Sequence, residues 1–196
     1  MTVGYLRIIA GSLKGRKIRV PEVDGVRPTP DRVREALFSI LGATVPGARV
    51  LDAYAGSGAL GLEAYSRGAS TVMFLEADSQ VYQVLQSTLR DLAVTDACKA
   101  VLGRVEGSPG RIMDVAPFDL ILADPPYSHR AAENFIDWAS APGLLAPGGR
   151  LILEREASGR AATGDRSRLR LARTARYGRT ALDFYAVSSD PESRPA

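Results

Sequence analysis

The chain has 196 residues, of which 45% are hydrophobic and 24% charged, a composition typical of one globular domain with a buried core. Its apolar runs are too short to span a membrane, and its N-terminus lacks the pattern of a secretion signal. Cys98 is the only cysteine, which excludes an internal disulfide and a cysteine-based zinc site, so we expect a cytoplasmic protein.

The net charge of +3 hides an uneven distribution. Residues 1–34 contain eight basic and three acidic side chains, and residues 155–179 contain eight and two. Residues 35–154, between them, contain eight basic and fourteen acidic side chains. Two basic ends around an acidic middle favour a polyanion such as nucleic acid as the partner. The alternative is that the arginines are merely solvated.

The N-terminal part is predicted to be a basic extension. Residues 7–20 have the pattern of two short strands joined by a turn rich in Gly, Ser and Lys, and we expect a hairpin extension over residues 1–26. The basic side chains on this hairpin are Lys14, Arg16, Lys17 and Arg19. A helix is expected to begin at Asp31, since apolar residues then recur at helical spacing.

Strands and helices then alternate along the chain. The expected strands are 49–54, 71–78, 99–103, 118–126 and 149–156, and the expected helices are 58–68, 79–93, 109–115 and 130–141. The strands are apolar throughout rather than alternately polar, as in strands buried on both faces. We therefore predict an α/β fold with a mostly parallel central sheet and helices on both of its faces.

The C-terminal part departs from this alternation. Residues 168–178 and 180–187 alternate between polar and apolar residues, which predicts an antiparallel hairpin at the edge of the sheet. Residues 188–196 are polar and contain proline, so we expect a disordered tail. The main domain is accordingly predicted to span residues 27–187.

The stretch "LDAYAGSGALGLEA" contains the spacing G-x-G-x-x-G at Gly56, Gly58 and Gly61, and Glu76 follows 20 residues after Gly56. This spacing is typical of a turn that binds a dinucleotide, so an oxidoreductase dependent on a nicotinamide cofactor is one hypothesis. Asp52 at the end of the preceding strand argues against it, because a carboxylate there would repel a pyrophosphate. The same carboxylate can orient the glycine loop or meet a cationic ammonium group.

A second motif, "DPPY", follows the apolar strand that begins at Phe118. The Asp124 carboxylate and the Pro125 carbonyl can accept the two N–H hydrogens of an exocyclic base amine, so that the nitrogen lone pair points at an electrophilic carbon. Pro126 would fix the backbone, and Tyr127 would stack on a flipped base. The structural alternative is a proline turn that ends a strand, with a buried tyrosine.

Together the two motifs resemble class I S-adenosylmethionine-dependent amino-methyltransferases. More closely, the chain resembles the RsmD-type enzymes, bacterial 16S ribosomal RNA (guanine-N2)-methyltransferases. The resemblance covers about residues 7 to 187 and is carried in order by "RIIAGSLKGRKIRVP", "RPTPDRVREALFSIL", "LDAYAGSGALGLEA", "ADPPY" and "YGRTALDFY". It implies a Rossmann-like fold, S-adenosyl-L-methionine as cofactor, and ribosomal RNA, within a small-subunit particle, as substrate. We also expect a monomer that needs no metal.

The resemblance implies roles for individual residues. The cofactor is expected to be held by Asp52, Gly56 and Gly58 at its methionine portion, by Glu76 at its ribose, and by Thr29, which would help to close the pocket. The target amine is expected at Asp124, Pro125 and Tyr127, and the RNA backbone at the four basic hairpin residues. Relatives carry Asp or Asn after the third strand of the main sheet, whereas this chain has Gly103, Arg104 and Val105. The adenine is therefore expected to meet the backbone of Val105.

Other functions remain open at this point. A DNA adenine-N6 or cytosine-N4 methyltransferase would use the same amine chemistry, although the chain leaves little room for a domain that reads duplex sequence. An RNA-binding assembly factor that has lost catalysis is a further alternative, which the intact "DPPY" disfavours. His129, the only histidine, is expected to be a solvated loop side chain rather than a catalytic base.

Overall fold

The computed structural model describes residues 3–21, 29–107, 109–125, 129–164 and 168–187. The tail predicted at 188–196 and the boundary predicted at residues 26 and 27 lie outside these residues. No helix in the described part of the chain is long and apolar enough to cross a membrane.

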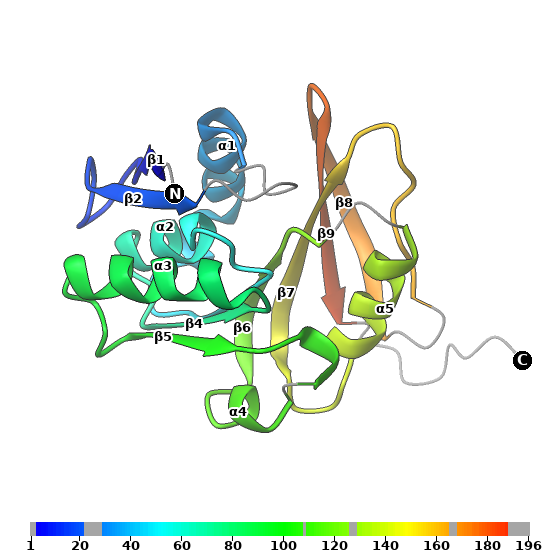
Figure 1. Ribbon diagram of the computed structural model, residues 1–196. Coiled ribbons are helices and arrows are strands. Elements are labelled where there is room, and N and C mark those ends of the chain that lie inside the picture. The colour runs from blue at the N-terminus through cyan, green and yellow to red at the C-terminus, as the bar shows by residue number, and fades with distance from the viewer. Residues whose placement is uncertain (1–2, 22–28, 108, 126–128, 165–167, 188–196) are drawn as a thin grey trace, which may run out of the picture.

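A seven-stranded sheet with the order β5-β4-β3-β6-β7-β9-β8 forms the centre of the molecule (Figure 1). Its strands are β3 (Arg49–Ala53), β4 (Thr71–Glu76), β5 (Cys98–Leu102), β6 (Phe118–Ala123), β7 (Leu145–Glu156), β8 (Leu169–Tyr177) and β9 (Thr180–Val187). The first five strands in this order are parallel, and β9 and β8 close one side as an antiparallel pair. The predicted fold, including the C-terminal hairpin, is confirmed.

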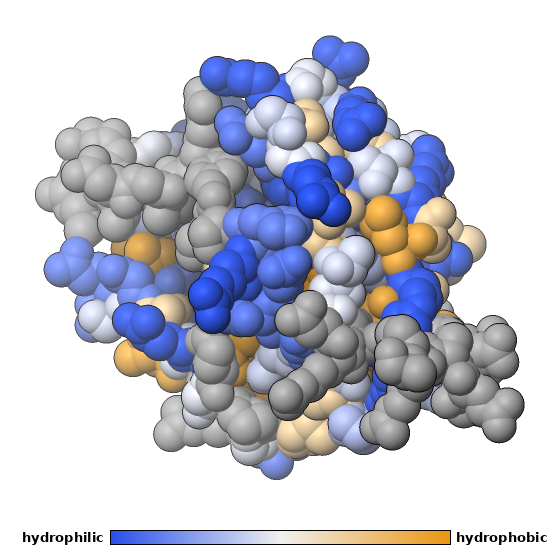
Figure 2. Space-filling view, turned by 90° about the vertical axis from the view of Figure 1, so that its right-hand side faces the viewer, coloured by the Kyte–Doolittle hydropathy of each residue, from blue (hydrophilic) through white to orange (hydrophobic). Residues whose placement is uncertain are grey.

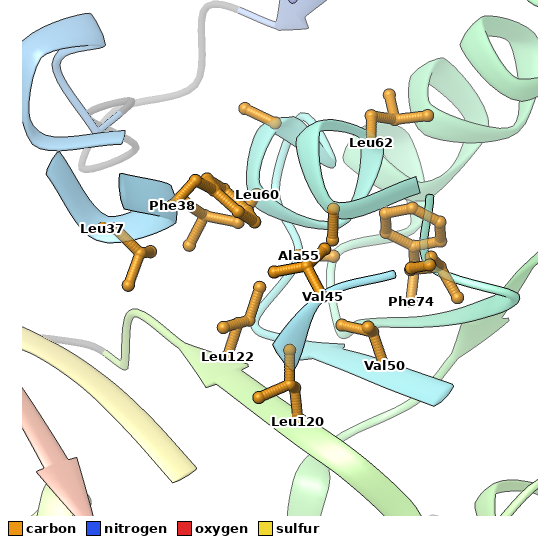
Figure 3. Close-up of a cluster of buried hydrophobic side chains, with 14 of the residues drawn as sticks. Leu37, Phe38, Val45, Val50, Ala55, Leu60, Leu62, Phe74, Leu120 and Leu122 are labelled. Atoms are coloured by element: carbon orange, nitrogen blue, oxygen red, sulfur yellow. The ribbon is translucent and has the colours of Figure 1, made fainter. Parts of the chain in front are cut away.

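Helices cover both faces of the sheet. They are α1 (Asp31–Leu41), α2 (Ala59–Ser66), α3 (Ser79–Asp91), α4 (Pro109–Met113) and α5 (His129–Ala139), with short 3₁₀ turns at Gly42–Thr44 and Val105–Gly107. On one face, Phe38 of α1 and Leu60 of α2 pack with Leu120 and Leu122 of β6 (Figure 3). On the other face, apolar residues of α4 and α5 pack with the alternate residues of the same strands. The two faces therefore have separate cores.

The N-terminal extension differs in detail from the prediction. β1 (Val3–Arg7) pairs with β2 (Lys17–Pro21) in a separate two-stranded sheet, and residues 8–16 form a long loop rather than the ends of two strands. The loop packs along helix α2, because the Glu63 carboxylate of this helix accepts hydrogen bonds from the backbone N–H groups of Ile9 and Ala10, at 2.8 and 3.1 Å. These donors are consequently unavailable to a hairpin ladder.

A buried ion network joins this loop to α1 and α2. Arg34 and Glu63 are both fully buried, and their Nη1 and Oε2 atoms are 3.9 Å apart. Arg34 Nη2 also donates to the backbone oxygen of Arg7 at 2.9 Å and to Asp31 at 2.7 Å. Arg67 completes the network with a 2.7 Å hydrogen bond to Glu63. One carboxylate thus holds three segments that are distant in sequence.

We expect Glu63→Gln to lower the free energy of unfolding by about 3 kcal/mol, because it removes the buried carboxylate beside Arg34 and leaves that buried guanidinium with only the exposed Asp31 as counter-charge. Equilibrium unfolding in urea measures the change. Glu35→Gln, at an exposed position of α1, is the matched control and is expected to change stability by less than about 0.5 kcal/mol. Equal effects of the two substitutions would contradict the assigned role of the network.

Candidate active site

The glycine loop between β3 and α2 has a backbone that only certain residues can adopt. Gly56 and Gly58 have φ angles of +54° and +77°, and Tyr54 has a φ of +60° although it is not glycine. A Cβ on Gly61, in the first turn of α2, would lie 2.4 Å from the Phe74 ring on β4. The glycines are therefore required by the turn and by the close packing of helix on sheet, as the motif predicts.

Asp52 fixes the start of α2. Its side chain is buried, and Oδ2 accepts a 2.8 Å hydrogen bond from the backbone N–H of Gly61. Loss of hydration raises the pKa of Asp52 to about 8, against the lowering effect of that hydrogen bond, and the negative charge of Glu76 adds to the rise. Of the two roles considered for this carboxylate, the orientation of the glycine loop is visible in the structure.

Glu76 ends β4 and faces the same loop. One carboxylate oxygen accepts a 2.8 Å hydrogen bond from the N–H of Gly56, and the other accepts one of 2.7 Å from the N–H of Asp78. An ionised carboxylate has further lone pairs and can accept more hydrogen bonds than these. Contact with a ribose therefore stays a prediction for this residue.

Asp124 follows directly after β6. Leu122, two residues earlier, lies opposite Asp52 of β3, so the two aspartates project from the same face of the sheet. Burial and the negative charges of Glu154 and Asp52 raise the pKa of Asp124. Pro125 is buried beside it. Pro126 and Tyr127 of the "DPPY" motif lie outside the described residues.

Glu154 of β7 is a site residue that the motif analysis missed. Leu153 lies opposite Ala123, so Glu154 is the neighbour of Asp124 on the next strand. Thr29, which is buried, donates a 2.7 Å hydrogen bond from Oγ1 to Glu154 Oε2. Burial raises the pKa of Glu154, and this hydrogen bond opposes the rise. Thr29, expected at the cofactor pocket, thus makes its described contact at the β7 side of the site.

A repeated sequence signal could have indicated Glu154. Four parallel strands each have an acidic residue near or directly after their carboxyl ends, and all four acids project from one face. These residues are Asp52, Glu76, Asp124 and Glu154. The sequence motifs indicate only the first three. In the described part of the chain, no group of three His, Cys, Asp or Glu side chains is arranged to hold a metal ion.

The segment after β5 lies at the same edge. The Gly103 N–H donates a 2.9 Å hydrogen bond to the backbone oxygen of Glu76, which holds this segment beside β4. Val105 begins the 3₁₀ turn that follows, and its side chain is buried. Val105 therefore follows two residues after the contact with Glu76, and its contact with adenine stays a prediction.

One expectation close to the site is corrected. His129 is the first residue of α5 rather than part of a loop, and its Nε2 lies 3.1 Å from Oε1 of Glu133, one turn further along the helix. The side chain is half-exposed, as expected. Helical spacing of residues 129 and 133 brings the two side chains together, which explains why the helix begins earlier than the sequence pattern indicated.

The four basic residues of the extension divide into two pairs. Arg16 donates a 3.1 Å hydrogen bond to the backbone oxygen of Asp91, and Arg19 forms a 2.8 Å ion pair with the carboxylate of the same residue on α3. Lys14 and Lys17 are exposed. The arginines therefore attach the extension to α3. Lys17 Nζ lies 5.3 Å from the centroid of the Tyr5 ring, and both lysines are exposed to solvent.

Comparison with known proteins gives the family. A model of the family described as conserved hypothetical protein 95 matches residues 6–186. Ribosomal RNA small subunit methyltransferase D of Escherichia coli is 38% identical over 153 residues, which cover 78% of this chain and 76% of the relative. The protein of the same name from Haemophilus influenzae is 37% identical over 154 residues, covering 78% and 80%. The chain belongs to the RsmD family.

Solved structures agree with this assignment. A putative methyltransferase, yhhF, from Escherichia coli is 34% identical to this RsmD-family chain, with a TM-score of 0.79 over 95% of this chain and 100% of the other. An RNA methyltransferase from Salinibacter ruber, solved with S-adenosyl-L-homocysteine, has a TM-score of 0.66 at 14% identity. It covers 86% of this chain and 98% of its own, and shares the fold alone. The predicted family and fold are confirmed.

The buried acids predict how the stability of the ligand-free protein depends on pH. The pKa of Asp52 rises from 3.8 when unfolded to about 8 when folded, so between these values the folded protein holds the proton more tightly. The free energy of unfolding therefore decreases as pH rises through this window. We expect a melting temperature a few degrees lower at pH 8.5 than at pH 6.

Asp52→Asn removes one of the titrating groups and is expected to flatten this dependence without abolishing it, since the pKa of Asp124 is raised as well. Asp96→Asn, at an exposed position, is the control and leaves the dependence unchanged. Thermal melting across this pH range makes the measurement. An unchanged slope for Asp52→Asn would show that this carboxyl group titrates normally.

Proposed function

We propose that this rRNA methyltransferase, whose cofactor is S-adenosyl-L-methionine, modifies the exocyclic N2 amine of a guanine in 16S ribosomal RNA. The observation that carries the proposal is the position of Asp124. Its carboxylate follows β6 directly, on the strand adjacent to β3 and on the same face as Asp52. An acceptor for an amine therefore lies next to the loop that would hold the methyl donor. The resemblance to RsmD-type enzymes adds guanine N2 as the target.

The chemistry of the site fits this cofactor better than a dinucleotide. S-adenosyl-L-methionine carries a sulfonium and an ammonium group, and its ribose offers two hydroxyl donors. The residues at this edge supply buried or half-buried carboxylates, at Asp52, Glu76 and Asp124. Burial raises the pKa values of Asp52 and Asp124. A nearby cation would stabilise the ionised form of these carboxylates, whereas a pyrophosphate would destabilise it.

The proposed reaction is an in-line displacement. When bound, the cofactor supplies an electrophilic methyl carbon on a positively charged sulfur. The Asp124 carboxylate and the Pro125 carbonyl accept the two amine hydrogens, so the nitrogen lone pair is directed at that carbon. As the N–C bond forms, the C–S bond breaks with its electrons on sulfur, and the positive charge that develops on nitrogen is stabilised by acceptors already in position. The methylated amine then releases one proton to water.

Further parts of the proposal complete the assignment. Tyr127 stacks on the flipped base, Pro126 fixes the backbone before it, and the Val105 backbone meets the cofactor adenine. We propose residues 1–26 as an RNA-binding extension, 27–187 as the catalytic domain and 188–196 as a tail. We expect the enzyme to act as a monomer, without metal, on RNA in a small-subunit particle in the cytoplasm.

RNA contact is proposed at two surfaces of the molecule. Lys14 and Lys17 are exposed on the extension. At the other side, Thr180 of β9 lies opposite Glu156 of β7, so the turn between β8 and β9 is at the carboxyl edge of the sheet, where it projects beyond the other strands (Figure 1). Figure 2 shows the largely hydrophilic face of the molecule on this side. Arg179 in this turn is exposed.

Asp124→Asn is expected to lower the methylation rate about 1,000-fold, because the amide can no longer stabilise the charge that develops on nitrogen. Single-turnover assays with small-subunit particles from a strain lacking the gene measure this rate. The dissociation constant for S-adenosyl-L-homocysteine is expected to change less than about threefold.

Asp119→Asn, at the opposite end of β6, controls for general effects of substitution on this strand. If Asp124→Asn weakened cofactor binding and turnover equally, Asp124 would be a structural residue and the proposed reaction would lose its acceptor. Mapping of the methylated nucleotide by mass spectrometry, in the same assay, tests guanine N2 against adenine N6 and cytosine N4.

Joint replacement of Arg176 and Arg179 by glutamine is expected to weaken RNA binding and to reduce the slope of log K against log salt by about 1.5, since two phosphate contacts are lost. Both side chains are exposed, without a partner in the described part of the chain. Filter binding at several salt concentrations measures the slope. Arg90 and Lys99, exposed on α3 and β5, form a matched control pair and are expected to leave it unchanged. Identical slopes for the two variant pairs would show that the β8–β9 turn does not contact RNA.

A further inference from the structure

Glu154 occupies a defined place relative to the two halves of the site. The strand order β4-β3-β6-β7 brings Glu76, Asp52, Asp124 and Glu154 side by side near the carboxyl edge, with Asp52 two residues deeper along its strand than the other three. The first two contact the glycine loop, through the N–H groups of Gly56 and Gly61 respectively. Asp124 is the proposed acceptor for the target amine. Glu154 therefore lies on the far side of the amine from the cofactor loop, where the rest of the base must be accommodated.

The carboxylate of Glu154 is oriented by one specific contact. Thr29 Oγ1 donates a 2.7 Å hydrogen bond to Oε2, and the threonine is only 6% exposed. Oε1 has no hydrogen-bond partner within the described part of the chain. Thr29 has its single hydroxyl proton committed to this bond. One carboxylate oxygen is thus fixed, and the other remains available to a donor beside Asp124.

The Watson–Crick edges of the bases differ at the atom next to the target amine. Guanine carries an N1–H donor beside its N2 amine, whereas adenine N1 and cytosine N3, beside their own amines, are acceptors. A second carboxylate adjacent to the one that holds the amine can accept the N1–H of guanine. The same carboxylate would face the lone pair of adenine or cytosine, leaving two buried acceptors without a donor, which is strongly unfavourable.

We propose that Glu154 determines the specificity of the enzyme for guanine by accepting the N1–H hydrogen bond through Oε1, with Thr29 as its positioning residue. The inference rests on the proposed function, since it takes Asp124 as the acceptor of the base amine. The protein would then recognise two adjacent groups of guanine, the N2 amine and the N1–H, and not the amine alone. The two strands β6 and β7 would then each provide one carboxylate to the guanine edge.

The base 2-aminopurine tests this contact, because it retains the 2-amino group of guanine but lacks the N1–H. It also lacks O6, so a variant of Glu154 is needed to assign the preference to the N1 position. The substrate is the small-subunit particle, or an RNA fragment from it, with guanine or 2-aminopurine at the mapped target nucleotide. We expect the wild-type enzyme to favour guanine by about 50-fold in kcat/KM, the range expected of one hydrogen bond to a charged group. Equal rates on the two bases would overturn the proposal without any variant.

Glu154→Gln then tests which residue reads the N1 position. Its amide can donate to the N1 acceptor of 2-aminopurine, so the preference for guanine is expected to fall below about fivefold, while affinity for S-adenosyl-L-homocysteine is unchanged. Thr29→Val is expected to reduce the preference partially. Glu156→Gln, exposed two residues further along β7, is the matched control and keeps the wild-type preference.

The outcomes separate the two proposals. An unchanged base preference in a folded Glu154→Gln variant, with thermal melting as the check on folding, would overturn the role of Glu154 and leave the proposed function standing. Methylation of adenine or cytosine by the wild-type enzyme would instead overturn the guanine-N2 function itself. A rate lowered equally on both bases would show that Glu154 supports the site structurally and does not read the base.

Discussion

The burial of several carboxylates at one edge of the sheet is the constraint on which the rest of the site depends. Parallel register places Asp52, Glu76, Asp124 and Glu154 on one face, at the ends of four adjacent strands. Like charges repel, and loss of hydration adds to the cost. Backbone N–H groups and one hydroxyl offset part of it. These costs raise the pKa values of Asp52 and Asp124, so a bound cation or N–H donor would stabilise their ionised forms.

Elsewhere in the fold, a buried acid is paired with a buried cation. Arg34 is fully buried on α1 and faces the buried Glu63 of α2, so a cation and an anion meet inside the helix layer. Glu63 also holds the N-terminal loop, at Ile9 and Ala10. Thr29 lies two residues before the first residue of α1, and its hydroxyl donates to Glu154.

Much of the fold follows from local sequence pattern, and the site follows only in part. Apolar strands separated by helical spacing predict the parallel sheet, and the glycine spacing predicts the loop beside Asp52. The contacts that complete the site are long-range: Thr29 and Glu154 are 125 residues apart, and Ile9 and Glu63 are 54 apart. No local periodicity encodes such pairs. The same reason explains why the local pattern puts the first hairpin strand too late in the chain. The N–H groups of Ile9 and Ala10 pair with Glu63 on a distant helix and not with the second strand.

The order of the strands explains why the two substrates can meet without sharing residues. Successive strands proceed from β3 outward through β4 to β5 in one direction, and from β6 to β7 in the other. The carboxyl ends on either side of such a reversal border the crevice where ligands bind in open α/β sheets. Asp52 and Asp124 end the two strands that flank it. In the proposed assignment, cofactor contacts would therefore accumulate on the β4 side and base contacts on the β7 side. Changes in β7 and its hairpin would then alter which base is accepted without disturbing the glycine loop.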